Sequence, residues 1–248
     1  MSSSEQIRYS FYSAIIHDTF DIYINGTGSA DRGPRQYVYY MDAGIKSGKE
    51  LRKQLGQLKD TGLANRIFVG IGHRGNFHEK RRRDFIPPLF DPDTTHGANI
   101  ISPFYLFLSQ ELIPSIEVRY GPPQERAIIG HSFGGLFVFY ALFQPDRLFQ
   151  RFYALSPSLW VNEYNAFDRE KTFFTENKSL DAFLYLSAGG AEKINLILKG
   201  NRRMRTLLNT RQYQGLILRY QEFPGKTHNS QVPLSIRYVL KHLNEPLR

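Results

Sequence analysis

The chain contains no cysteine among its 248 residues. This absence excludes disulfide bridges, thiolate metal sites and a cysteine nucleophile, so that a nucleophile must be an oxygen or a lysine. No apolar run is long enough to span a bilayer. The N-terminus also lacks the basic start and the apolar stretch of a signal peptide. We therefore expect a cytoplasmic protein with no membrane partner.

Metal-ligand patterns are missing as well. His73, His78 and His96 fall in one polar stretch, but their spacing is irregular and no H-E-x-x-H pair is present. We interpret them as loop histidines, and we expect neither a metal nor a cofactor. The sequence also shows no internal repeat and no low-complexity segment.

Acidic residues are fewer than basic ones: the chain has 23 Asp and Glu and 32 Lys and Arg, which gives a net charge of +9. The basic residues are spread along the chain and no nucleic-acid motif is visible, so we expect no nucleic-acid partner. Two explanations of the positive charge stay open: it attracts an anionic small substrate, or the surface is simply basic. The oligomeric state is not indicated.

Core material is ample, since 41% of the residues are apolar and 14% are aromatic. Apolar strands alternate with helices, which predicts an α/β protein with a mostly parallel twisted sheet of about eight strands and helices on both faces. We expect a single domain over residues 1–248.

The predicted elements follow from hydrophobic periodicity. Strands are expected at 8–16, 19–25, 37–41, 66–71, 127–129, 152–155, 181–187 and 215–223. Helices are expected at 49–58, at 103–118 with a kink at Pro114, and at 136–143, 192–211 and 233–243. Residues 73–101 are expected to form a long irregular loop, and such loops over a scaffold are usually functional or disordered.

The most informative segment is Gly130-His131-Ser132-Phe133-Gly134. It matches the G-x-S-x-G nucleophile elbow, and an apolar strand runs into it while an apolar helix leaves it. The turn lifts the serine hydroxyl above the sheet edge, and a Cβ at Gly130 or Gly134 is expected to clash with a neighbouring element. We predict that Ser132 is a catalytic nucleophile rather than a solvated serine in a tight turn.

A serine hydroxyl needs a base, normally a histidine within hydrogen-bond reach. In an elbow of this type the chain order is serine, then acid, then histidine, and only His228 and His242 follow Ser132. His228 lies in a loop directly after the last predicted strand, whereas His242 lies inside the closing helix. We therefore predict His228 as the base.

The acid is chosen among eight candidates between Ser132 and His228. Active-site groups on an open α/β sheet lie at the carboxyl ends of strands. Asp181 begins its strand and Glu222 lies within one, whereas Glu192 follows a strand in a glycine turn. We predict Glu192, although a helix N-terminal acid favoured by the macrodipole or a serine–histidine dyad without an acid stays open.

The oxyanion hole needs two N–H donors. Phe133 follows the nucleophile and opens a helix, so its N–H is free to point at an oxyanion. The second donor comes from the loop after the third strand, which indicates Gly44 or an immediate neighbour. Asp42 is expected to brace this turn rather than to catalyse.

Together these motifs resemble the esterase family of the α/β-hydrolases, the group of esterase D and the siderophore esterases. The matching segments are V-Y-Y-M-D-A-G (38–44), F-V-G-I-G (68–72), R-R-R-D-F-I-P-P (81–88), Q-E-L-I-P-S-I-E (110–117), I-G-H-S-F-G-G-L-F (129–137), A-L-S-P-S-L-W (154–160), S-A-G-G-A-E (187–192) and G-K-T-H-N-S (225–230). The resemblance covers residues 10–243 and implies the α/β-hydrolase fold. One departure is Ala43, which stands where the family usually has the glycine of L-D-G.

The resemblance also implies where substrate binds. It places Trp160 near the pocket, although a large aromatic is more often core packing. It places the segment 81–84 at the border of the active site, where Arg82 and Arg83 would attract an anionic ferric catecholate. In the alternative, one arginine pairs with Asp84 to pin the loop while the others face solvent.

The sequence thus predicts a cofactor-independent serine carboxylesterase with a small-molecule ester substrate, either a siderophore lactone or an acyl-sugar or feruloyl-type ester. A non-catalytic ligand-binding module on a hydrolase scaffold is the other hypothesis, because a fold alone does not establish activity.

Overall fold

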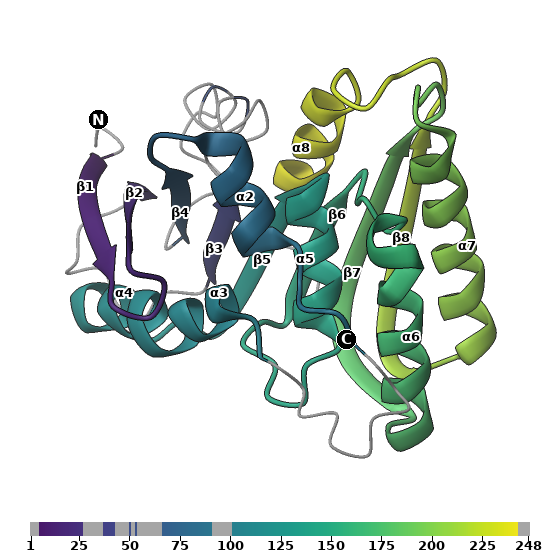
Figure 1. Ribbon diagram of the computed structural model, residues 1–248, viewed down its shortest axis with the longest axis horizontal. Helices are drawn as coiled ribbons and strands as arrows, with labels where there is room; N and C mark the ends of the chain where they lie inside the picture. Colours follow the sequence, from purple (N-terminus) through teal and green to yellow (C-terminus); the bar gives the residue numbers. More distant parts are fainter. Residues whose placement is uncertain are drawn as a thin grey trace.

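The computed structural model describes residues 5–26, 37–42, 50, 53, 66–90 and 101–242. Its strands form one eight-stranded sheet in the order β1-β2-β4-β3-β5-β6-β7-β8 (Figure 1). The strands are β1 (Glu5–Ser13), β2 (Asp18–Gly26), β3 (Tyr37–Asp42), β4 (Arg66–His73), β5 (Glu125–His131), β6 (Arg151–Leu155), β7 (Ser179–Gly189) and β8 (Gln214–Phe223). The predicted α/β fold is confirmed, and one domain over residues 1–248 stays a prediction.

The sheet has an antiparallel edge and a parallel centre. β1 pairs with β2, and β2 pairs with β4, in antiparallel registers. All remaining neighbours, from β4 through β3 and β5 to β8, are parallel. The chain places β4 on one side of β3 and β5 on the other, so the strand order reverses at β3. Ligands of open α/β sheets bind at the carboxyl ends of strands at such a switch point.

Helices cover both faces of the sheet, as predicted. The described helical segments are α2 (Phe77–Phe85), α3 (Pro103–Leu106), the π-helical η1 (Phe107–Leu112), α4 (Ile113–Tyr120), α5 (Phe133–Leu142), α6 (Val161–Glu176), α7 (Asn195–Arg211) and α8 (Val232–Lys241). Residues from α2 to α7 contribute to the larger core cluster, and α8 contributes to a second one. None of the helices in the described ranges is long and apolar enough to cross a membrane.

The two core clusters follow from the two-residue period of the strands. In β7, Leu184 and Leu186 point into the larger cluster, whereas Phe183 and Tyr185 point into the smaller one. Tyr185 stacks there on Tyr238, with ring centroids 4.3 Å apart. Because all four are buried, β7 reads as a continuous apolar run, as expected for a strand with both faces covered.

One expectation about the elements was wrong. Residues 73–101 are not one irregular loop, because β4 extends to His73 and α2 spans 77–85. The helix predicted at 103–118 is present as α3, η1 and α4, and its irregular part is the π-helical turn at 107–112, immediately before Pro114, whose missing N–H disturbs the regular ladder. Helix α6 has no counterpart among the predicted elements.

The predicted helix at 49–58 lies almost entirely outside the described residues. Only positions 50 and 53 are described there, and both are helical.

Candidate active site

Ser132 sits at the turn between β5 and α5 with φ 61° and ψ −115°. A positive φ is strained for a residue other than glycine, and such strain is typical of a nucleophile elbow. The turn is tight because a Cβ on Gly130 would overlap the carbonyl of Gly134. The expectation for Gly134 was wrong, since the nearest atom to its Cβ would be a side-chain oxygen of Asp42 at an ordinary 3.5 Å. The second close approach is at Gly135, where a Cβ would lie 2.9 Å from Pro157.

Glu192 and His228 are brought together from the ends of two neighbouring strands. The Nδ1 atom of His228 lies 3.1 Å from Oε2 of Glu192. The Glu192 side chain is fully buried, whereas that of His228 is 25% exposed. The other carboxylate oxygen, Oε1, accepts hydrogen bonds from Ser156 Oγ at 2.7 Å and from the Gly189 N–H at 3.3 Å. This geometry suits a carboxylate that orients an imidazole.

The loops after β7 and β8 are bonded directly to each other. The N–H of Gly190 donates to the carbonyl of Phe223, and that of Ala191 donates to the carbonyl of Lys226, at 2.8 and 2.9 Å. A Cβ on Gly189 would overlap the carbonyl oxygen of Lys226. The glycine turn before Glu192 is therefore required for the close approach of the histidine loop. The helix α7 begins only at Asn195, so the alternative of a helix N-terminal acid for Glu192 is wrong.

His131 holds the loop of His228 in place. It is buried, and its Nε2 atom donates to the carbonyl oxygen of His228 at 3.0 Å. The two rings lie 4.5 Å apart between centroids. Burial, with a smaller contribution from the neighbouring His228, lowers the pKa of His131 to about 3. His131 is therefore neutral at neutral pH and acts as a hydrogen-bond donor to the backbone of the histidine loop.

The Ser132 hydroxyl has an unexpected partner. Its Oγ lies 3.2 Å from Oγ of Ser158, and no hydrogen bond joins it to His228 among the described residues. The N–H of Ser158 also donates to the Ser132 carbonyl at 3.1 Å. Catalytic hydrogen bonds are often long in unliganded enzymes and shorten in complexes. The side chain of Ser132 is half-buried, so it is accessible from solvent.

The three arginines of α2 have three different environments. Arg81 is buried and donates from Nε and Nη2 to Oδ2 of Asp42 at 3.0 and 2.7 Å. Its Nη2 also reaches the carbonyl of His131 at 3.3 Å. Arg81 thus connects the end of β3 to the nucleophile elbow through its ion pair with Asp42. The turn that Asp42 is expected to brace lies outside the described residues.

Arg83 forms ion pairs with Asp84 and Asp18, at 2.6 and 2.9 Å. These contacts match the alternative in which an arginine pairs with Asp84 and holds the segment in place. A role of Arg83 in substrate binding stays a prediction. Arg82 is exposed, and its guanidinium carbon lies 5.6 Å from the centre of the Phe133 ring. Arg82 therefore contacts a residue of the elbow and also faces solvent.

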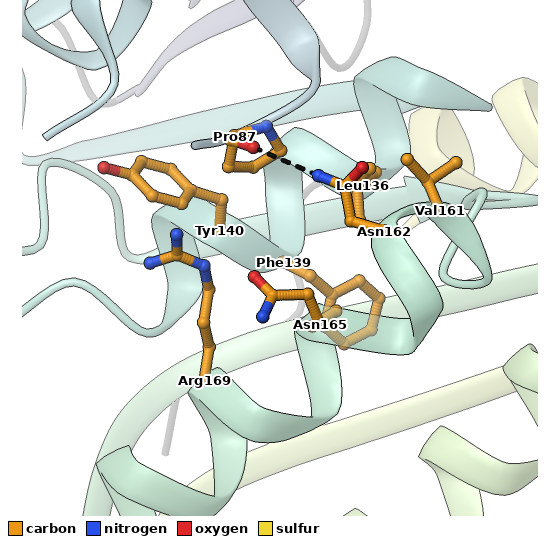
Figure 2. Close-up of a pocket in the computed structure, with 9 residues that line it drawn as sticks. Pro87, Leu136, Phe139, Tyr140, Val161, Asn162, Asn165 and Arg169 are labelled. Carbon is orange, nitrogen blue, oxygen red and sulfur yellow. Dashed lines mark hydrogen bonds between the residues drawn. The ribbon is translucent and has the colours of Figure 1, made fainter. Parts of the chain in front are cut away.

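The chain after α2 is held against α6 (Figure 2). Asn162 and Asn165 bond to the backbone of Pro87 and Phe90, and Arg169 donates to the carbonyl of Pro88. A small cavity, whose lining residues are drawn in Figure 2, lies between these side chains and α5, and Leu136 is one of the lining residues. The segment 86–90 is thus pinned through its own backbone, which keeps α2 in place beside the elbow.

Trp160 lies just before α6 and packs, half-buried, against the larger core cluster. In sequence it follows Ser158 by two residues. Its role in substrate binding stays a prediction. Gly44 falls outside the described residues, as does His96. His73 is not a loop residue, because it ends β4 and bonds through Nε2 to Asp84 at 2.8 Å. Within the described ranges, no three His, Cys, Asp or Glu side chains form a group that could hold a metal.

Two functional candidates, Ser156 and Ser158, were missed by sequence reasoning. The segment S-P-S-L-W was noted for its tryptophan alone, although hydroxyls directly after a strand next to the elbow strand were a usable signal. Both side chains are buried and contact the proposed catalytic residues.

Comparison with known proteins shows the family of this chain. The family described as "Putative esterase" matches residues 31–230. The chain belongs to this family. The ferri-bacillibactin esterase BesA of Bacillus subtilis is 29% identical over 239 residues, which cover 84% of this chain and 78% of BesA. A siderophore triacetylfusarinine C esterase of Aspergillus fumigatus is 32% identical over 120 residues, covering 45% of this chain and 40% of that enzyme.

Solved structures share the fold. The BES protein from Bacillus cereus superposes with a TM-score of 0.77 at 24% identity, covering 97% of this chain and 95% of that one. The enterobactin hydrolase IroE in complex with DFP superposes with a TM-score of 0.68 at 21% identity, covering 98% and 96%. Together with the family assignment, these similarities identify the esterase as a carboxylic ester hydrolase with an α/β-hydrolase fold.

Proposed function

We propose that this esterase cleaves its substrate through an acyl-enzyme on Ser132, with His228 as general base and Glu192 as the acid that orients it. The observation that carries the proposal is the strained Ser132 turn beside a buried carboxylate 3.1 Å from the imidazole of His228. Strand ends from β5, β7 and β8 contribute these three groups at one edge of the sheet.

In the proposed reaction, Ser132 Oγ attacks the ester carbonyl while its proton passes to Nε2 of His228. The C–O bond of the ester breaks as His228 returns this proton to the leaving alcohol. Water then attacks the acyl-enzyme with His228 again as base, which releases the acid and restores Ser132. The N–H groups of Phe133 and of Gly44 or its neighbour are the proposed donors to the oxyanion.

We propose a ferric siderophore or a related anionic ester as substrate. BesA and the Aspergillus enzyme are named for siderophore esters, and Arg82 offers an exposed cation beside Phe133. Arginine recognises oxyanions through a planar fork of N–H groups, which suits a catecholate complex. An acyl-sugar or feruloyl-type ester would need no such cation.

The first test combines covalent labelling with a substrate comparison. A fluorophosphonate should label the wild type and leave Ser132→Ala unmodified, and that variant should lose about 10⁴- to 10⁶-fold in kcat with the same urea midpoint. Turnover of a ferric catecholate trilactone should exceed that of p-nitrophenyl esters. If the wild type resists labelling and cleaves neither ester, the alternative of a ligand-binding module is correct.

A further inference from the structure

The turn Ser156-Pro157-Ser158 lies at the carboxyl end of β6, which is the strand between β5 and β7 in the sheet. The nucleophile follows β5 and the acid follows β7, so this turn is the part of the sheet edge that separates them. Each of the two serine hydroxyls of the turn contacts one of these two residues. Ser158 Oγ lies 3.2 Å from Ser132 Oγ, and Ser156 Oγ donates to Glu192 at 2.7 Å.

The turn itself is rigidly held. Ser156 has φ 42°, a strained value for a residue other than glycine. Its N–H donates to the carbonyl of Ser187 on β7 at 2.8 Å. Pro157 packs against Gly135 of the elbow helix, and its carbonyl accepts from Nδ2 of Asn201 on α7 at 3.0 Å. Strain that persists in a well-bonded turn is typical of functional sites.

Backbone bonds attach the same turn to the nucleophile. The N–H of Ser132 donates to the carbonyl of Leu155, which precedes the turn, at 3.0 Å, and the N–H of Ser158 donates to the carbonyl of Ser132 at 3.1 Å. Both serine side chains of the turn are buried, with at most 2% of either residue exposed. The hydroxyl of Ser158 therefore has little competition from water for Ser132.

Resting on the proposed function, we propose that Ser158 is a further catalytic residue and that Ser156 is a positioning residue. In the resting enzyme the Ser132 and Ser158 hydroxyls bond to each other. When substrate binds, the Ser132 proton turns toward His228, and the Ser158 O–H donates to Ser132 Oγ. Ser158 keeps its own proton throughout, so the balance of the acylation step is unchanged. Its bond stabilises the partial negative charge that develops on the attacking oxygen.

Ser156 acts through Glu192. The Ser156 O–H, the Gly189 N–H and His228 all contact the buried carboxylate of Glu192 and stabilise its negative charge. Without the Ser156 donor, the carboxylate attracts the protonated imidazole of His228 more strongly. The pH at which the base becomes active should then move upward.

The test uses the rate of fluorophosphonate labelling as a function of pH, which needs no natural substrate. Ser158→Ala should label about tenfold more slowly at every pH, as expected for the loss of a hydrogen bond of about 1.4 kcal/mol. Ser156→Ala should shift the midpoint of the pH profile upward. Ser109→Ala, which removes a hydroxyl on η1 far from these contacts in sequence, should match the wild type in both respects.

Folding is checked by melting each variant. If Ser158→Ala does not fold, Ser158→Cys keeps the shape with a weaker donor, and its labelling rate should fall below that of the wild type. Unchanged rates and midpoints in folded Ser158 and Ser156 variants, with normal labelling of the wild type, would overturn this inference alone. An unlabelled wild type would instead contradict the proposed function.

Discussion

The two sides of Ser132 are built in opposite ways. On the histidine side, Glu192 bonds to His228 and to the N–H of Gly189, and His131 bonds to the backbone of His228, so that their positions are set within the protein. On the arginine side, α2 presents the buried Arg81 and two exposed arginines. Arg83 forms ion pairs with Asp84 and Asp18, whereas Arg82 has no carboxylate partner among the described residues. In the proposed function, the catalytic groups are preorganised on the first side by these contacts, while the second side leaves the charge of Arg82 exposed to solvent.

The histidine side should have the larger effect on rate. Glu192→Gln keeps the shape of the side chain but replaces the acceptor facing Nδ1 of His228, so the imidazole loses its orienting carboxylate. We expect a fall of about 10³-fold in kcat with little change in KM, measured on a p-nitrophenyl ester. Glu222→Gln, an acid on β8 that pairs with Arg202, serves as the matched control. An unchanged kcat in Glu192→Gln would favour a serine–histidine dyad.

Arg81 tests the structural half of the arginine side. Arg81→Met leaves the buried Asp42 without its main partner, and breaking a buried ion pair costs about 3–5 kcal/mol. We expect the free energy of unfolding in urea to fall by that amount. Arg83→Met removes two ion pairs in which the arginine is exposed, and Asp84 keeps His73 as a partner, so the cost should be about 1 kcal/mol or less. Equal losses in the two variants would contradict the distinction between them.

His131 sharpens the comparison through pH. Its pKa is lowered to about 3 in the folded protein by burial, so the unfolded chain takes up the proton first as the pH falls. The stability is fully present above pH 6.5 and is lost progressively between pH 6.5 and 3. Urea unfolding should lose roughly 3 kcal/mol more between pH 7 and 4 in the wild type than in His131→Gln. Parallel losses in both proteins would show that His131 does not titrate as expected.

Arg82 should give the smallest and most selective effect. Arg82 is exposed, and among the described residues its guanidinium contacts the ring of Phe133. Arg82→Met should therefore leave folding and the turnover of neutral esters unchanged. We expect about a tenfold rise in KM for an anionic ester, which weakens further in high salt. A neutral ester affected to the same degree would mean that Arg82 shapes the pocket rather than attracting charge.

Much of the candidate site could be predicted because its signals are local or follow chain order. The elbow needs Gly130 and a strand–helix junction, and both are visible in sequence. Glu192 was selected by its place after a strand, and the structure lays it against His228. The expectation at Gly134 was wrong because the room around this glycine is set by Asp42, which is far away in sequence, and the close approach falls instead at Gly135 against Pro157.

The sequence by itself determined the fold class, the nucleophile turn and the order of its proposed partners, because hydrophobic period and glycine placement act over a few residues. Only the tertiary structure decided which arginine is buried and which serines contact Ser132 and Glu192. Successive residues of a helix point about 100° apart, so Arg81 and Arg82 differ through what α2 packs against. Likewise, Ser156 and Ser158 acquire their contacts because β6 lies between β5 and β7, a neighbourhood that the sheet creates.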